Sequence, residues 1–169
     1  MPYSISLSVL VTSMCLSAQF VQTDIRDDFH HNDLDKERLS HMIENVQYEN
    51  SALTLAYKGL CETMLAEYAF LPTSKLRAFN RGKEKVETAI SQSPKNCELS
   101  YIRLLVQLNA PRFLGYYDNI EQDLDYFISN CNDQIAGKWR SIFVDNLLQG
   151  KFLSQKQKDQ LLSLKKHPS

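Results

Sequence analysis

The fold is decided by residues 97–131, "CELSYIRLLVQLNAPRFLGYYDNIEQDLDYFISNC". Residues 97–109 are apolar almost all round, which is typical of a helix at the centre of a fold rather than on its surface. After Pro111 and Gly115, apolar residues recur at the spacing of one helix face: Ile120, Leu124, Phe127 and Ile128. The pattern predicts two antiparallel helices joined by the corner "NAPRFLGYYDNI", residues 109–120.

Most residues of this corner have an expected structural role. Helix-ending, turn-forming and helix-starting residues follow in order: Asn109, Pro111, Gly115, Asp118 and Glu121. The open end of the hairpin core is expected to be filled by Phe113, Leu114 and Tyr116. Arg112 and Tyr117 remain as the residues expected to face outward. If the corner carries a binding surface, these two are its predicted partner contacts.

Beyond this hairpin, helical spacing predicts further helices over about 34–47, 51–70, 74–92 and 134–148, and a last one after Ser154. Thr73 and Ser74 are expected to cap the helix over 74–92, and Ser154 with Gln157 the last one. No stretch alternates like a β-strand. The predicted fold class is all-α, with antiparallel helical hairpins stacked as a short array or irregular bundle of about seven helices. The expected domain spans residues 34–167.

Charge and composition narrow the function classes. The 169 residues include 19 basic and 20 acidic side chains, with a formal net charge of −1. Nucleic-acid binding draws its affinity from an excess of Lys and Arg, so nucleic acid is not an expected partner. The chain has no phosphate-cradling glycine loop, no G-x-S-x-G turn and no H-E-x-x-H motif. The sequence therefore predicts no cofactor and favours a non-enzymatic protein.

Residues 1–18, "MPYSISLSVLVTSMCLSA", contain no charged side chain. The apolar run from Ile5 to Ala18 is shorter than the roughly 20 residues of a transmembrane helix, which favours a secretory signal peptide. Cleavage after Ser17 or Ala18 would give a periplasmic or secreted mature chain without a transmembrane segment. A wrongly assigned start, a buried N-terminal helix and a lipoprotein acylated at Cys15 stay open as alternatives.

Residues 19–33 are acidic, polar and without helical periodicity, so a flexible lead-in is expected. Its segment "DDFHHND" contains weak candidates for metal ligands: His30, His31 and Asp33. Adjacent histidines in a flexible segment do not supply the closed tetrahedral geometry of a structural zinc site, so a solvated polar segment is the favoured interpretation. A solvated stripe is likewise favoured over a metal site for three residues on one face of the next helix: Glu37, His41 and Glu44.

The stretch "AISQSPKN", residues 89–96, and the small residue Gly59 resemble the helix-packing positions of a tetratricopeptide repeat. From Gly59 to Gly82 the spacing exceeds that pattern, which implies long arms and an insertion, "LPTSKLRAF", at residues 71–79. Over about 50–148 the chain thus resembles a degenerate tetratricopeptide-like protein. It also looks like exported helical-hairpin proteins of bacteria that carry an "NAP.FLGY.DNI" corner. That resemblance implies fold and export, and no activity.

Cysteine positions suggest a covalent link within the central hairpin. Cys97 opens one arm and Cys131 closes the other, so both are expected at the same end. A disulfide between them would stabilise the fold by about 3 to 4 kcal/mol in the chain-entropy model. Two buried thiols are the alternative, and Cys61, in mid-helix, is predicted to be a buried thiol.

The functional prediction is an exported, non-enzymatic interaction or scaffold protein whose partner is an unidentified protein or peptide of the cell envelope. The alternative is a small metal-dependent hydrolase or metal-binding protein that uses the Asp/His cluster. The C-terminal lysines form a modest basic patch that either touches an anionic surface or is the solvated face of the last helix: Lys151, Lys156, Lys158, Lys165 and Lys166.

Overall fold

The computed structural model describes residues 24–45, 48 and 50–165, and within them every regular element is helical. The predicted all-α class is confirmed. The α-helices are α1 (Ile25–His30), α2 (Lys36–Glu44), α3 (Ala52–Leu65), α4 (Pro72–Gln92), α5 (Cys97–Asn109), α6 (Ile120–Gln134), α7 (Gly137–Leu148) and α8 (Gln155–Lys165). Two short 3-10 helices, η1 (Ala66–Tyr68) and η2 (Arg112–Leu114), follow α3 and α5.

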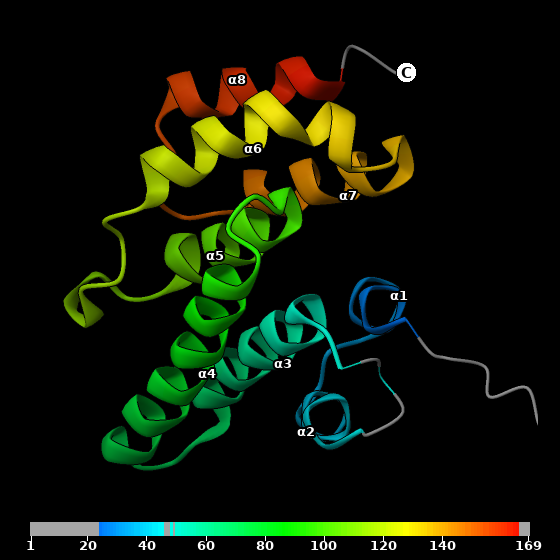
Figure 1. Cartoon of the computed structure of the whole chain (residues 1–169). Coiled ribbons are helices and arrows are strands. Elements are labelled where there is room, and N and C mark those ends of the chain that lie inside the picture. Colours follow the sequence, from blue (N-terminus) through cyan, green and yellow to red (C-terminus); the bar gives the residue numbers. More distant parts are fainter. Residues whose placement is uncertain (1–23, 46–47, 49, 166–169) are drawn as a thin grey trace, which may run out of the picture.

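Helices α3 and α4, and likewise α5 and α6, lie side by side as antiparallel pairs (Figure 1). The pair α3–α4 is the longest, and α1 and α2 lie against the α3 side of it. On the other side, α5 contacts both α3 and α4 and leads into a second group formed by α6, α7 and α8. The end of the α3–α4 hairpin, at the lower left of Figure 1, projects away from this second group.

Helix α5 lies at the centre because it has hardly any polar face. It contacts α3, α4, α6 and α7. Its buried apolar side chains are Leu99, Tyr101, Ile102, Leu104, Val106 and Leu108. Gln107 is also buried, and neither its amide nitrogen nor its amide oxygen has a hydrogen-bond partner. The predicted bounds of this helix, 97–109, agree with the structure at both ends.

Two glycines allow α3 and α4 to approach closely. A Cβ added to Gly59 would lie 2.7 Å from the carbonyl oxygen of Gly82, and one added to Gly82 would lie 2.7 Å from the backbone nitrogen of Thr63. Side chains at either position would therefore push the two backbones apart. The close-packing role expected of Gly59 is confirmed, and its partner is Gly82.

The flexible lead-in predicted for residues 19–33 is wrong for its described part, residues 24–33. The Asp24 side chain accepts a hydrogen bond from the Arg26 backbone N–H and so caps α1, while Ile25 and Phe29 lie in the core. The domain thus begins before residue 34. The predicted signal peptide and residues 19–23 lie outside the described residues.

Helix starts agree with the sequence in part. At α8 the Ser154 hydroxyl accepts from the Gln157 N–H, and Gln157 Oε1 accepts from the Ser154 N–H, which confirms the predicted capping box. Thr73 and Ser74 do not cap α4, because Pro72 already occupies its first turn. The box predicted at Asp118 and Glu121 is also wrong: α6 begins after Asn119, without a side-chain cap.

Candidate binding surface

The Asp/His cluster of the N-terminal segment is divided between the interior and the surface. His30 turns inward, whereas His31 and Asp33 are exposed. The buried Asp28 carboxylate accepts hydrogen bonds from Arg38, Tyr48 and Asn32. In the described part of the chain, no three His, Cys, Asp or Glu side chains are grouped so that they could hold a metal ion. The structure therefore does not bring the three candidate ligands together.

His30 belongs instead to a network that sequence reasoning missed. Its Nε2 lies 3.1 Å from the Tyr57 hydroxyl, which donates to Glu98 Oε1 at 2.7 Å. Arg26 Nε donates to the same carboxylate oxygen at 2.6 Å. These bonds join α1, α3 and α5 inside the protein.

The other side of the His30 ring faces α7. Asn146 Nδ2 lies 3.3 Å from His30 Nδ1 and donates to the Tyr101 hydroxyl at 2.9 Å. Because an amide nitrogen only donates, Nδ1 accepts and Nε2 carries the proton that is donated to Tyr57. The rings of Trp139 and Phe143 lie 5.7 and 5.3 Å from the His30 ring. The imidazole is thus neutral, and both of its nitrogens are occupied.

Burial, together with the smaller effects of the nearby His31 and Arg26, lowers the pKa of His30 to about 4. Burial also raises the pKa of Tyr57 well above its usual value, with the Glu98 charge as the next cause. A neutral histidine whose nitrogens are both engaged fixes α1 on the domain and leaves no free lone pair for a substrate or metal ion. The signal available in the sequence was the capping Asp24 followed by Ile25 and Phe29 at helical spacing.

The corner of the central hairpin is only partly as predicted. Tyr116 is buried, contacts the Phe79 ring and donates a hydrogen bond to Glu87. Phe113 is 86% exposed, so its predicted place in the hairpin core is wrong. It lies in η2, the short turn that precedes Gly115, whose φ of 64° lies in the left-handed region.

Arg112 and Tyr117 are both exposed, as expected. The Arg112 guanidinium lies 5.0 Å from the centre of the Tyr117 ring and 4.4 Å from that of Phe152. The two predicted contact residues are therefore already in contact with each other and with the segment after α7. Because the two side chains already contact each other, less of their surface is available to a partner.

Both cysteines of the central hairpin are buried free thiols. They lie at the same end of it: the Cys97 backbone N–H donates to Gln134 at the end of α6, and the Cys97 thiol contacts the Phe127 carbonyl oxygen at 3.6 Å. Burial raises the pKa of Cys97 to about 12, with Cys131 as the next cause. The Cys97–Cys131 disulfide stays a prediction. Cys61 is a buried thiol, as expected.

The most exposed apolar side chains outside the corner gather at the end of the α3–α4 hairpin. Phe70 is 95% exposed, and its neighbours are Leu71 at 54%, Tyr68 at 50% and Leu76 at 47%. Chain geometry explains the position of the first two, because Ala69 and Leu71 have extended backbones and the chain bends at Phe70 and Leu71 between η1 and α4. The predicted insertion, residues 71–79, contributes Leu71 and Leu76 to this surface.

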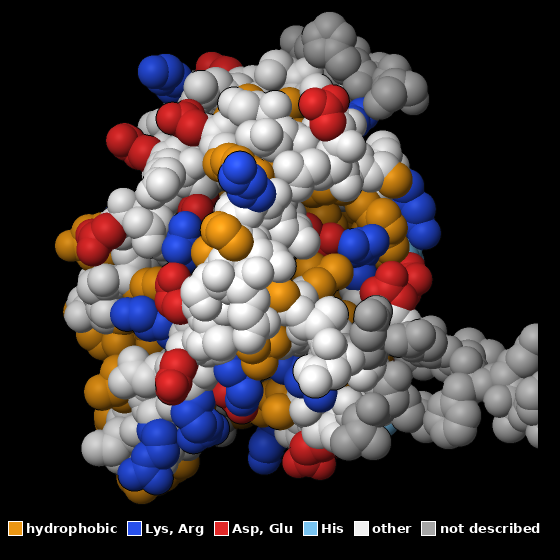
Figure 2. All heavy atoms as spheres, in the orientation of Figure 1, with side chains coloured by type: hydrophobic (Ala, Val, Ile, Leu, Met, Phe, Trp, Pro, Cys, Tyr) orange, Lys and Arg blue, Asp and Glu red, His pale blue; other side chains and the backbone are white. Residues whose placement is uncertain are grey.

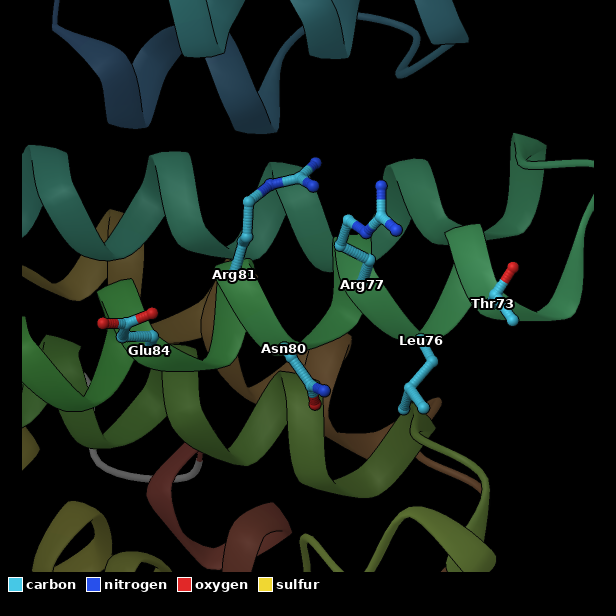
Figure 3. A pocket seen from close by; sticks show the side chains of 6 residues that line it. All are labelled: Thr73, Leu76, Arg77, Asn80, Arg81 and Glu84. Carbon is cyan, nitrogen blue, oxygen red and sulfur yellow. The ribbon is translucent and has the colours of Figure 1, made fainter.

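Three basic residues follow most of the apolar ones along the chain, in α4 and away from the end of the hairpin. Lys75, Arg77 and Arg81 are exposed on the first three turns of α4. In Figure 3 the Arg77 and Arg81 side chains point to one side of α4, and Leu76 and Asn80 point to the other. All four border a shallow groove of about 350 Å³. Figure 2 shows Lys and Arg side chains beside apolar ones at this lower left end of the molecule.

We call this surface the hairpin end and define it by seven residues: Tyr68, Phe70, Leu71, Lys75, Leu76, Arg77 and Arg81. Arg81 is the only one of its cations with a described ion pair, a distant 3.9 Å contact with Glu62. Lys75 donates to the backbone carbonyl of Glu67 at 3.4 Å. Residues 66–81 contain these three cations and one carboxylate, Glu67, so their formal charge is +3 − 1 = +2.

None of the helices described is both long and apolar enough to span a bilayer. The tetratricopeptide-like resemblance stays a prediction. No protein-family model, curated protein or solved structure matches this chain.

Proposed function

We propose that this protein is an exported, non-enzymatic binding module whose contact surface is the hairpin end. The observation that carries the proposal is the 95% exposure of Phe70 beside three further exposed apolar side chains. Isolated exposed apolar residues are ordinary on protein surfaces, but adjacent large ones at one projecting end are typical of contact sites.

The fold itself does not need these side chains. Phe70 lies between η1 and Pro72, where a polar residue would serve the turn equally well. Its exposure to water is unfavourable by about 1.5 to 3 kcal/mol relative to full burial. Burial against a partner would recover this free energy, which supports a role in binding.

The inward position of His30 supports a non-enzymatic role. The Asp/His cluster was the basis of the metal-dependent alternative, and two of its members now serve other purposes: His30 joins α1 to α7, and Asp28 is bonded to Arg38. Export is proposed from the predicted signal peptide, which places the partner in the cell envelope or outside the cell.

Site-specific photocrosslinking in the native cell tests the proposal. A photoreactive phenylalanine analogue replaces Phe70 in the full chain, and matched chains carry it at Phe113 or at the exposed Asp125 of α6. We expect a discrete adduct, protein or lipid, from position 70 and much less from the other two. Equal adducts from all three positions, or none from position 70, would refute the hairpin end as the contact surface.

A further inference from the structure

We infer that the hairpin end binds the surface of an anionic phospholipid bilayer. Phe70 and Leu71 enter the boundary between headgroups and acyl chains, and Lys75, Arg77 and Arg81 contact lipid phosphates. The inference rests on the proposed function and names the partner class of that same surface.

The shape of the surface favours a bilayer. The apolar residues lie at a projecting end of the molecule, so a flat and deformable surface can contact them without meeting the rest of the protein (Figure 1). The neighbouring groove is shallow, and most of the side chains that border it are polar or charged: Thr73, Arg77, Asn80, Arg81 and Glu84. A peptide helix needs an apolar groove in which to bury one face, and this groove does not supply one.

The order of residues along α4 matches the depth profile of a bilayer surface. At about 1.5 Å per residue, Lys75, Arg77 and Arg81 stand roughly 5, 8 and 14 Å behind the first residue of α4. Apolar side chains of interfacial segments lie roughly 5 to 10 Å into the headgroup and acyl boundary. With Phe70 and Leu71 at that depth, Lys75 and Arg77 are level with the phosphates, and Arg81 reaches forward along its flexible side chain. Tyr68 has the amphipathic ring that is enriched at this interface.

The local charge favours anionic lipid over neutral lipid. The hairpin end is positive although the whole chain has a formal net charge of −1. Glu62, the nearest acidic partner of Arg81, accepts a hydrogen bond from Lys85 at 2.5 Å, so its charge is already compensated. Each cation near an anionic membrane strengthens binding about fivefold.

Vesicle co-sedimentation of the full chain tests the inference. The probes are vesicles of phosphatidylglycerol mixed with phosphatidylcholine, and vesicles of phosphatidylcholine alone. We expect binding to the mixed vesicles that weakens with salt, and far weaker binding to the neutral ones. The double variant Phe70→Ser, Leu71→Ser should lower the apparent affinity at least about tenfold.

Matched variants elsewhere on the surface serve as controls. Phe113→Ser removes an aromatic ring that is also largely exposed, and Lys151→Gln with Lys156→Gln removes two C-terminal cations. Both should leave vesicle binding unchanged. By contrast, Lys75→Gln with Arg77→Gln should lower it by an order of magnitude or more. Far-ultraviolet circular dichroism checks that every variant is folded.

Equal binding to both vesicle types would overturn the inference, and so would binding unaffected by the Phe70 and Leu71 changes. If position 70 crosslinks a protein while the vesicles are not bound, the proposed function stands and the lipid assignment is wrong. If position 70 crosslinks nothing in cells, the proposed function itself fails.

Discussion

Acidification should destabilise this fold through one side chain, His30. Its ring lies among Phe29, Trp139 and Phe143, accepts from Asn146 and donates to the Tyr57 hydroxyl. A second proton on Nδ1 would face the amide N–H of Asn146, and the resulting charge would be largely shielded from water. The folded state therefore resists protonation.

The size of the effect follows from the pKa of His30, about 4 in the folded protein against 6.5 for an unperturbed histidine. The unfolded chain takes up the proton as the pH falls below 6.5, whereas the folded chain does so only near pH 4. Stability should thus be unaffected by this group above pH 6.5, fall as the pH drops towards 4, and level off below it. The loss near pH 4.5 is about 2 to 3 kcal/mol.

Urea unfolding at about pH 7 and about pH 4.5 measures this loss, with the single tryptophan, Trp139, as a fluorescent reporter beside the ring. The variant His30→Phe keeps an aromatic ring but cannot titrate. Its stability is lower at neutral pH because the bonds to Asn146 and Tyr57 are lost, and its further loss on acidification should be smaller by about 2 kcal/mol. The control, His41→Gln, changes an exposed histidine and should retain the full pH dependence. An unchanged slope in His30→Phe would refute the role of this group.

Three further predictions concern the core. Gln107→Met should raise the free energy of unfolding by about 1 to 2 kcal/mol, because the amide of Gln107 is buried without a partner; a loss of stability would mean that the amide is satisfied. Gly82→Ala should cost about 3 kcal/mol in chemical denaturation, whereas an uncrowded helical glycine would gain stability from the same change. Cys97 and Cys131 are separate buried thiols in the structure; if the protein is exported to an oxidising compartment, mass spectrometry of its non-reduced peptides should find the two linked, and alkylation of Cys97 in the unfolded protein without reductant would contradict this.

The sequence predicts best those helices whose formation depends on residues close to them in the chain. Helix α5 was bounded correctly because its residues are apolar on every side and Asn96 and Pro111 flank it. The sequence does not predict helix α1, because its 6 residues are too few for a periodic pattern and it is held by residues far along the chain, such as Glu98, 72 positions away from Arg26.

The candidate sites were harder to predict, since a side chain's direction depends on tertiary packing. The sequence shows Phe113 and Tyr116 as equivalent aromatics of one corner, yet only Tyr116 faces Phe79 and Glu87. The insertion at residues 71–79 likewise shows no difference between Phe79, which is 6% exposed, and the residues at its other end. Which aromatic is buried is decided by the contacts between α4 and the corner, two segments that are distant in sequence.

The hairpin end can remain exposed because α3 and α4 are fixed to each other further along their length. The Gly59–Gly82 contact brings the backbones together, and Phe79 packs on Tyr116 one turn of α4 nearer to the end. The exposed side chains between Phe79 and the end of the hairpin, Phe70 among them, therefore contribute little to the stability of the fold. Phe70→Ser should change the free energy of unfolding by less than about 0.5 kcal/mol. Phe79→Ser, a matched change in the same hairpin, should cost at least about 3 kcal/mol. If both changes destabilised the protein equally, Phe70 would belong to the core, and its exposure could no longer be taken as a sign of binding.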